Sequence, residues 1–298
     1  MPIEILGVRM DKTTHTEALQ KAAGFLTAGG QHAIFTPNPE MLVKAQKDEY
    51  FKKVLNSSDL NLCDGFGLWL AVSLRGAKRR GNLPAKIERV TGVDFMLDVC
   101  RLAAEQGRGV YLLGTGDEKV IKKTAQNLQK QFPRLKIVGL DKGPQISELG
   151  ERENPAPRPS PHRGGQSFPL PYKGRGRERG SVAGLEIDQQ ENDRIISQIN
   201  QSQAEIVFVA FGMGKQEKWI YENLSKIPSV KIAIGVGGAF DYISGKIPRS
   251  PRLMRKIGLE WVYRLIRQPS RFFRIFNATV KFSLLVLGNS KIKNQNEK

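Results

Sequence analysis

Short apolar runs alternate with amphipathic stretches along most of the chain. Runs typical of strands occur at 32–36, 59–63, 109–113, 135–140 and 204–210, and another begins at Val230. Stretches with helical spacing begin near Glu40, Gly67, Asp117 and Lys215. This alternation predicts an α/β fold with a Rossmann-like, mainly parallel sheet flanked by helices.

Small and polar residues follow these predicted strands. They are Thr36, Asn38, Asp64, Gly114, Gly212 and Gly237. Because ligands of open parallel sheets bind beyond the carboxyl ends of the strands, we expect one cleft to collect these residues.

The alternation is interrupted once, and it stops near residue 245. Residues 151–180 hold six prolines and five glycines, and seven basic residues against three acidic ones. A disordered surface insertion at about 150–182 is expected within an α/β catalytic core of residues 1–244. The alternative is a basic, proline-rich recognition arm.

Residues 245–298 differ from the core in composition. They contain 13 Lys and Arg against two Glu, a net charge of +11. Two helical stretches flank Pro269, and the second has a basic stripe within a broad apolar surface that includes Phe282 and Leu284. Such a helix suits a membrane interface, so we expect a basic amphipathic helical appendage that binds membranes. The alternative is a C-terminal helix docked on the core with its arginines in water.

Composition narrows the class of protein. The 298 residues carry a formal net charge of +18, which favours polyanionic partners such as nucleic acid, anionic lipid or phosphorylated substrates. Two cysteines and three histidines give neither a disulfide framework nor zinc-ligand spacing. No signal peptide or membrane-spanning run is evident, so a cytoplasmic location is expected.

Asp64 ends an apolar run and precedes Gly-Phe-Gly. An ionised carboxylate at the edge of a core is costly unless it is compensated. It either caps the helix that begins near Gly67 or takes a proton from an attacking alcohol. The residues alone leave both roles open.

The glycine-rich turns GTGDEK, GMGKQEKW and GVGGAFDY match no complete phosphate-binding motif. Tight turns need glycine for steric reasons alone, yet each turn would also aim backbone N–H groups at a nucleotide diphosphate. No metal site is expected, since the sequence has no D-x-D pair and no His/Cys cluster. A departing diphosphate would then need arginines, and Arg264, Arg267, Arg271 and Arg274 recur in the tail. A merely solubilising basic tail is the alternative.

Several motifs occur together and in order. They are TPNPEMLVKAQKD, LCDGFGLWLA, ERVTGVDFM, VYLLGTG, QEKW, GVGGAFDYISGKIPRSP and GLEWVYRLIRQPSRFFR. In these segments the chain resembles the WecG/TagA/CpsF family of bacterial glycosyltransferases, over about 1–148 and 185–285. Residues 151–180 resemble an added segment that typical members lack.

The resemblance implies an inverting, metal-independent transfer of N-acetylmannosamine. The donor would be UDP-N-acetylmannosamine, and the acceptor the 4-hydroxyl of undecaprenyl-diphosphate-linked N-acetylglucosamine, as in a teichoic acid linkage unit. No cofactor is implied. The partners would be these two substrates and an anionic membrane surface at the inner face of the plasma membrane, where the protein would be peripheral. A homo-oligomer is compatible with the sequence.

The resemblance also assigns residues. Asp64 matches the proposed general base, and Thr36, taken as catalytic too, matches an acceptor- and sugar-pocket position together with Asn38. Binding roles fall on Arg89, Gln216, Arg264, Arg271, Arg274, Gly114 and Gly237. The chain departs from the family at Met213-Gly214, where Ala-Pro is usual, and at Gln268, where Glu is usual.

The sequence is compatible with two alternative functions. The same mechanism could use UDP-N-acetylmannosaminuronic acid or UDP-glucose in exopolysaccharide synthesis. A non-enzymatic nucleic-acid-binding protein would fit the charge, but the sequence lacks base-stacking aromatic motifs, so nucleic acid is not expected as a partner.

Overall fold

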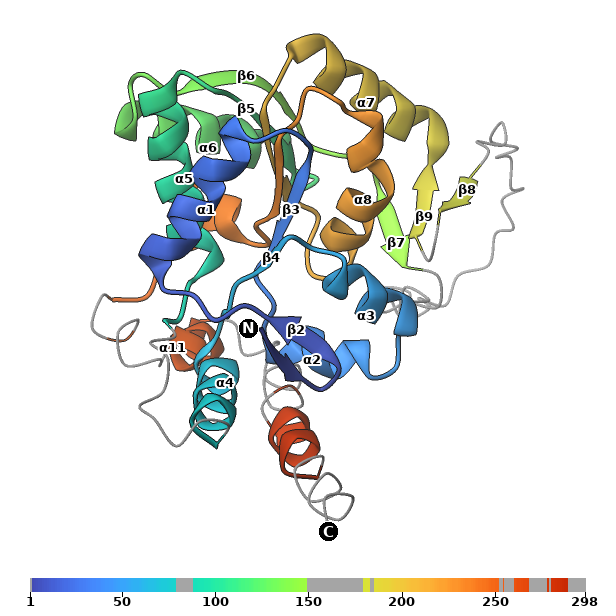
Figure 1. The fold of residues 1–298 in the computed structure, drawn as a ribbon. Helices are drawn as coiled ribbons and strands as arrows, with labels where there is room; N and C mark the ends of the chain where they lie inside the picture. Colours follow the sequence, from blue (N-terminus) through green and yellow to red (C-terminus); the bar gives the residue numbers. More distant parts are fainter. Residues whose placement is uncertain are drawn as a thin grey trace, which may run out of the picture.

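A computed structural model describes residues 2–78, 88–148, 179–182, 185–251, 254, 260–267, 278 and 280–288. Its centre is a six-stranded sheet in the order β4-β3-β11-β10-β5-β6, in which every neighbouring pair is parallel. These strands are β3 (His32–Phe35), β4 (Leu60–Asn61), β5 (Gly109–Gly114), β6 (Lys136–Asp141), β10 (Ile206–Ala210) and β11 (Ile232–Gly235). The predicted parallel α/β fold is confirmed (Figure 1).

Helices cover both faces of this sheet because the central strands are apolar on both sides. On β5, Val110 and Leu112 face one core cluster, whereas Tyr111 and Leu113 face the other. The first cluster includes residues of α1 (His15–Thr27), α5 (Gly92–Gln106), α6 (Glu118–Gln131) and α9 (Ala239–Ile243). The second includes residues of α2 (Pro39–Ala45), α3 (Glu49–Asn56), α4 (Phe66–Lys78), α7 (Gln189–Ser202) and α8 (Lys215–Asn223), with the 3-10 turn η1 (Leu224–Lys226) packed beside it.

The segment with helical spacing after Pro39 forms two helices rather than one. It breaks after Ala45, and Asp48 caps the second helix by accepting a hydrogen bond from the Phe51 N–H at 2.8 Å. A side chain that bonds the backbone in this way starts a new helix, and the chain can therefore turn between α2 and α3.

A hairpin of β1 (Ile3–Ile5) and β2 (Val8–Met10) lies next to the edge strand β4. The Asn61 N–H donates to Asp11 Oδ2 at 2.9 Å, and the Asp11 N–H returns a bond to the Asn61 carbonyl at 3.1 Å. The outer edge of β4 is therefore paired, which protects it from pairing with another chain.

A small antiparallel sheet flanks the expected insertion. Its order is β7-β9-β8, from β7 (Ile146–Glu148), β8 (Arg179–Val182) and β9 (Leu185–Asp188). Regular structure thus resumes at Arg179, within the segment for which none was expected, because residues 179–182 find a backbone partner in β9. Residues 149–178 lie outside the described part of the chain.

The C-terminal region contains α11 (Glu260–Arg267), and residues 280–288 are also helical. In Figure 1 both helices lie at the end of the molecule that also carries α4. Phe282 is buried and Val286 packs against the same core cluster as Leu68 and Val72 of α4. The expectation that Phe282 belongs to an apolar surface facing a membrane is wrong, because its ring completes the protein core.

Candidate active site at the carboxyl edge of the sheet

The loops that follow β3 and β4 run side by side. The Leu62 N–H donates to the Phe35 carbonyl at 2.9 Å, and the Asp64 N–H donates to the Pro37 carbonyl at 3.0 Å. These bonds continue the strand pairing past the end of the sheet. They hold Asp64 next to the loop that carries Thr36 and Asn38, so the predicted convergence of these loops is confirmed.

Arg89 reaches the same place from a different part of the chain. The Val90 N–H donates to the Cys63 carbonyl at 3.0 Å, which sets residues 88–90 beside the residue that precedes Asp64. Burial raises the pKa of the Cys63 thiol, the Asp64 carboxylate raises it further, and the Arg89 guanidinium lowers it. Both charges therefore act on one buried sulfur, which places a carboxylate and a guanidinium in one neighbourhood.

Thr36 faces the start of α5. A Cβ atom added to Gly92 would lie 3.2 Å from Thr36 Oγ1, so the hydroxyl is packed against the first residue of that helix. Glycine allows this approach because it has no side chain.

The structure also bears on the helix-capping role of Asp64. The helix α4 begins at Phe66, and the Trp69 N–H donates to the Gly65 carbonyl at 3.1 Å. This places Gly65, with φ of 88°, rather than Asp64 directly before the helix. Asn38 caps α2, because its Oδ1 accepts from the Met41 N–H at 3.0 Å. Asn38 thereby fixes the turn that leaves β3.

Arg249 is a cation near this site that sequence reasoning did not select. Its Nη2 lies 2.7 Å from Asp94 Oδ2 and 3.5 Å from Thr91 Oγ1, and Thr91 caps α5. Its membership of the motif GVGGAFDYISGKIPRSP could have drawn attention to Arg249. Its place beside the Thr36–Gly92 contact could be read only from the fold.

Glycine turns follow β5 and β11 at the same edge. Gly114 has φ of 128°, and a Cβ added to it would lie 2.7 Å from the carbonyl atoms of Ala210, so only glycine fits between β5 and β10. The Gly237 N–H donates to Gln216 Oε1 at 2.9 Å. Since β11 lies between β3 and β10, Gly237 belongs to the turn next to the Thr36 loop.

Gln216 is buried and is joined to a second buried side chain, Glu217. Its Nε2 donates to Glu217 Oε1 at 2.7 Å, and Glu217 Oε2 accepts from the Gly214 N–H at 2.7 Å. Together they connect the turn after β10 to the turn after β11. Burial raises the pKa of Glu217 to about 7, although the bonds from Gln216 and Gly214 oppose this rise.

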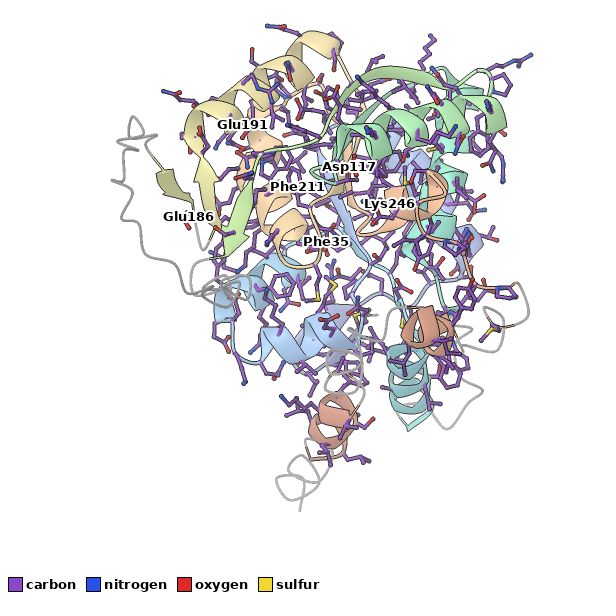
Figure 2. All side chains as sticks on the ribbon, turned by 180° about the vertical axis from the view of Figure 1, so that it is seen from behind. Phe35, Asp117, Glu186, Glu191, Phe211 and Lys246 are labelled. Carbon is purple, nitrogen blue, oxygen red and sulfur yellow. The ribbon has the colours of Figure 1, made fainter. Side chains whose placement is uncertain are left out.

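Phe35 is the last residue of β3 and is buried, and the partly buried Phe211 follows the end of β10; both are labelled in Figure 2. The Phe211 ring meets Trp219 edge-on, with centroids 5.6 Å apart. On another part of the same edge, Lys246 Nζ lies 3.3 Å from Asp117 Oδ2 and 3.8 Å from Asp241 Oδ1.

The predicted tail arginines are described only in part. Arg264 lies in α11, without a described side chain, and Arg271 and Arg274 lie outside the described residues. The structure therefore brings together Thr36, Asp64 and Arg89, and separately Gln216 and Gly237, while the role of the tail arginines stays a prediction.

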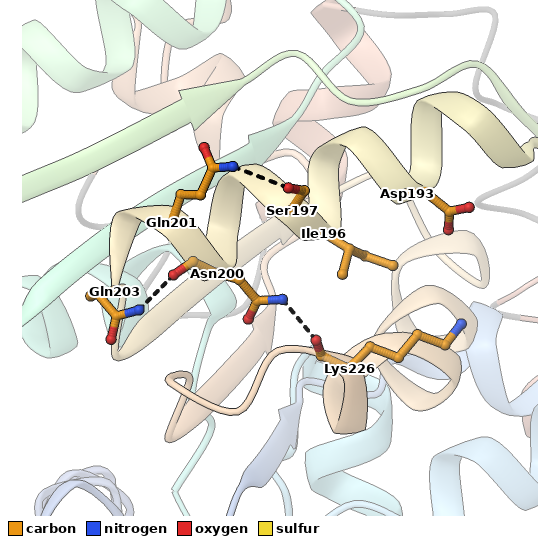
Figure 3. Close-up of a pocket in the computed structure, with 7 residues that line it drawn as sticks. All are labelled: Asp193, Ile196, Ser197, Asn200, Gln201, Gln203 and Lys226. Atoms are coloured by element: carbon orange, nitrogen blue, oxygen red, sulfur yellow. Dashed lines mark hydrogen bonds between the residues drawn. The ribbon is translucent and has the colours of Figure 1, made fainter.

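A hollow of about 590 Å³ lies elsewhere, between α7 and η1. Figure 3 shows its lining by Asp193, Ile196, Ser197, Asn200, Gln201, Gln203 and Lys226. The Asn200 side chain donates to the Lys226 carbonyl at 2.9 Å, which links α7 to η1. Because α7 ends just before β10 begins, this hollow extends toward the opposite edge of the sheet from Asp64, and we assign it no part in the site.

Within the described ranges, no three His, Cys, Asp or Glu side chains are grouped as metal ligands would be. The helices described here are also too short or too polar to cross a bilayer.

The sequence was compared with known proteins. Residues 3–156 and 175–296 match the family described as the glycosyl transferase WecG/TagA/CpsF family. The chain belongs to this family. Residues 157–174 lie outside both matched stretches and coincide with most of the expected added segment. This glycosyltransferase therefore carries the family's sequence on both sides of residues 157–174, and the strands of the small antiparallel sheet lie within the matched stretches.

Three curated relatives share one name, N-acetylglucosaminyldiphosphoundecaprenol N-acetyl-beta-D-mannosaminyltransferase. The relative from Bacillus subtilis (strain 168) is 28% identical over 87% of this chain and 80% of its own. The relative from Bacillus spizizenii is 26% identical over 82% and 74%, and that from Staphylococcus aureus (strain MW2) is 23% identical over 98% and 94%. The chain is thus similar to these enzymes over most of its length.

Proposed function

We propose that this glycosyltransferase moves N-acetylmannosamine from UDP-N-acetylmannosamine to the 4-hydroxyl of undecaprenyl-diphosphate-linked N-acetylglucosamine. The names of the three relatives support the transferred sugar and the acceptor. The product would be a linkage unit of the teichoic acid type.

One observation carries the proposal. Backbone hydrogen bonds from Asp64 to Pro37 and from Val90 to Cys63 gather Thr36, Asp64 and Arg89 beside the carboxyl ends of β3 and β4. A carboxylate in that position suits a general base, and a guanidinium suits a diphosphate.

In the proposed reaction Asp64 takes the proton of the acceptor hydroxyl. The oxygen attacks C1 of the donor sugar from the face opposite the nucleotide, the bond between C1 and the phosphate oxygen breaks, and UDP leaves. The configuration at C1 is therefore inverted. Thr36, packed against Gly92, would fix the acceptor beside Asp64, and Asn38 would shape the pocket through the turn that it caps.

The leaving diphosphate gains negative charge, which must be stabilised. We assign this task to Arg89, to the tail residues Arg264, Arg271 and Arg274, and to backbone N–H groups of the glycine turns at Gly114 and Gly237. Gln216 would act through the Gly237 turn that it holds. No metal ion is then needed.

The acceptor is a lipid, so we place the enzyme at the inner face of the plasma membrane. The net charge of +11 in residues 245–298 would draw it to anionic lipid by about 1 kcal/mol for each cation near the surface. Membrane binding should accordingly weaken as salt is raised.

The test is a donor screen with a short-chain lipid-diphosphate-N-acetylglucosamine acceptor, read by mass spectrometry with and without EDTA. We expect one added N-acetylhexosamine from UDP-N-acetylmannosamine, in equal yield in both conditions. Product from UDP-glucose or UDP-N-acetylmannosaminuronic acid alone would reassign the donor. Loss of product in EDTA would refute metal independence.

A further inference from the structure

Large exposed apolar side chains gather at one end of the molecule. In the described part of the chain eight are exposed, and seven of them lie on α4, on α11 or on the helix of residues 280–288. Figure 1 shows these three helices together at the end that lies below the sheet. Exposed apolar patches on a folded chain mark interaction surfaces.

The helix α4 contributes a face of its own to this end. Phe66 is 44% exposed and Leu70, one turn later, is 41% exposed. The Trp69 ring lies beside Phe66, with centroids 5.5 Å apart. On the other side of the helix Leu68 and Val72 are fully buried, so α4 is apolar both toward the core and away from it.

The C-terminal helix is apolar on two sides as well. Phe282 and Val286 contact the core, whereas Leu284 is 64% exposed and Leu287 is 62% exposed. The inner side chains dock this helix on the same core cluster that holds α4.

Charge distinguishes the partners that could cover α4. From Gly65 to Ile87 the sequence has five basic residues and no acidic one. Arg75 and Lys78 belong to α4, and the other three basic residues follow it in the sequence. An apolar helix with basic residues in and after it is attracted to anionic lipid. A second copy of the chain in a two-fold contact would instead bring like charges together, which is unfavourable.

We propose that the outer face of α4, formed by the exposed Phe66 and Leu70 with the partly buried Trp69 at its border, inserts into an anionic bilayer. The proposal rests on the proposed function, since a lipid-linked acceptor gives the contact its purpose. Phe66 follows Asp64 by two residues, a chain length of about 7 Å. Insertion of Phe66 would therefore hold Asp64 at the depth of the headgroups, where the diphosphate of such an acceptor lies.

The experiment attaches an environment-sensitive fluorophore to Leu70→Cys in the full chain. Cys63 and Cys100 are buried and should not react. The matched control is Val138→Cys, because Val138 is 39% exposed, close to the 41% of Leu70, but lies on β6, outside the three helices. With vesicles of phosphatidylglycerol and phosphatidylcholine we expect a blue shift at position 70 and none at position 138. Phosphatidylcholine vesicles alone should give a smaller shift.

A second variant, which carries no fluorophore, measures how much Phe66 and Leu70 contribute to vesicle binding. The double change Phe66→Ser and Leu70→Ser should lower the vesicle partition coefficient by about tenfold, because two half-exposed apolar side chains lose their burial in lipid.

Two outcomes would overturn the proposal. If the chain sediments with vesicles but the fluorophore at position 70 shows no blue shift, the tail alone binds the membrane. If the blue shift needs no vesicles and grows with protein concentration, a second copy covers α4. Transfer to a water-soluble short-chain acceptor is measured in parallel, so that failure of membrane insertion and failure of the proposed function are told apart.

Discussion

The buried carboxyl group of Glu217 should make the stability of this enzyme fall between about pH 4.5 and pH 7. Its pKa rises from the model-compound value of 4.5 to about 7 because the group is buried. Over this range the folded chain holds a proton that the unfolded chain has lost. Stability therefore decreases as the pH rises through the window, and it is constant with respect to this group above and below it.

The size of the effect follows from the two pKa values. Each pKa unit corresponds to 1.36 kcal/mol, so the free energy of unfolding should fall by about 3 kcal/mol across the window. The change Glu217→Gln removes this titration. It also removes one acceptor, since a Gln side chain cannot accept from both Gly214 and Gln216, and this should cost about 1–3 kcal/mol.

Together, the lost titration and the lost acceptor predict that the difference in unfolding free energy between Glu217→Gln and the wild type changes sign with pH. At pH 4.5 the variant should be less stable than the wild type, and at pH 8 it should be equally or more stable. The assay is urea unfolding of both chains at a series of pH values, followed by circular dichroism. Glu118→Gln is the control, because Lys122 lowers the pKa of exposed Glu118 and its titration falls below the window. A constant difference between the wild type and Glu217→Gln at all pH values would refute the reasoning.

Three further changes test the site and the fold. Asp64→Asn should leave unfolding in urea nearly unchanged and lower turnover by about 10²-fold or more. Turnover near the wild-type value would show that Asp64 is not the general base. Gly114→Ala should destabilise the chain by about 2–4 kcal/mol in a urea titration, because its Cβ would lie 2.7 Å from the Ala210 backbone, and an unchanged midpoint would contradict that contact. Removal of residues 252–298 keeps the Arg249–Asp94 ion pair but exposes the core under Phe282. We expect a folded chain that is about 2 kcal/mol less stable in urea and almost inactive. Full activity of this shortened chain would exclude the tail from the site.

The strands β5, β10 and β11 could be predicted from the sequence because they are continuous apolar runs, buried on both faces. The expected run 109–113 and β5 differ by one residue. The strands β1, β2 and β8 have only three or four residues, too few to show a period, and they depend on partners elsewhere in the chain. That the loops after β3 and β4 lie side by side could also be predicted, since parallel strands end at one edge of the sheet.

Buried polar residues were not predictable in this way. The run Gln216, Glu217, Lys218 is polar and opens the helix expected near Lys215, yet all three side chains are buried. Lys218 Nζ lies 2.6 Å from Asp48 Oδ2, and this partner is 170 residues away in sequence. The spacing of apolar residues predicts which of them are buried. Burial of a charged side chain depends instead on a partner that only the tertiary fold brings near it.

The ladder that joins β7, β9 and β8 has a consequence for how this protein can vary. Both outer strands pair with β9, so Glu148 and Arg179 are held two strand spacings and three residues apart, about 14 Å. About five extended residues would bridge that gap. A longer connection is not needed to keep β7 and β8 paired with β9, so residues 157–174, which lie outside the family match, could be shortened or exchanged without breaking this ladder. Foreign epitopes or affinity handles could enter there with little effect on the rest of the molecule.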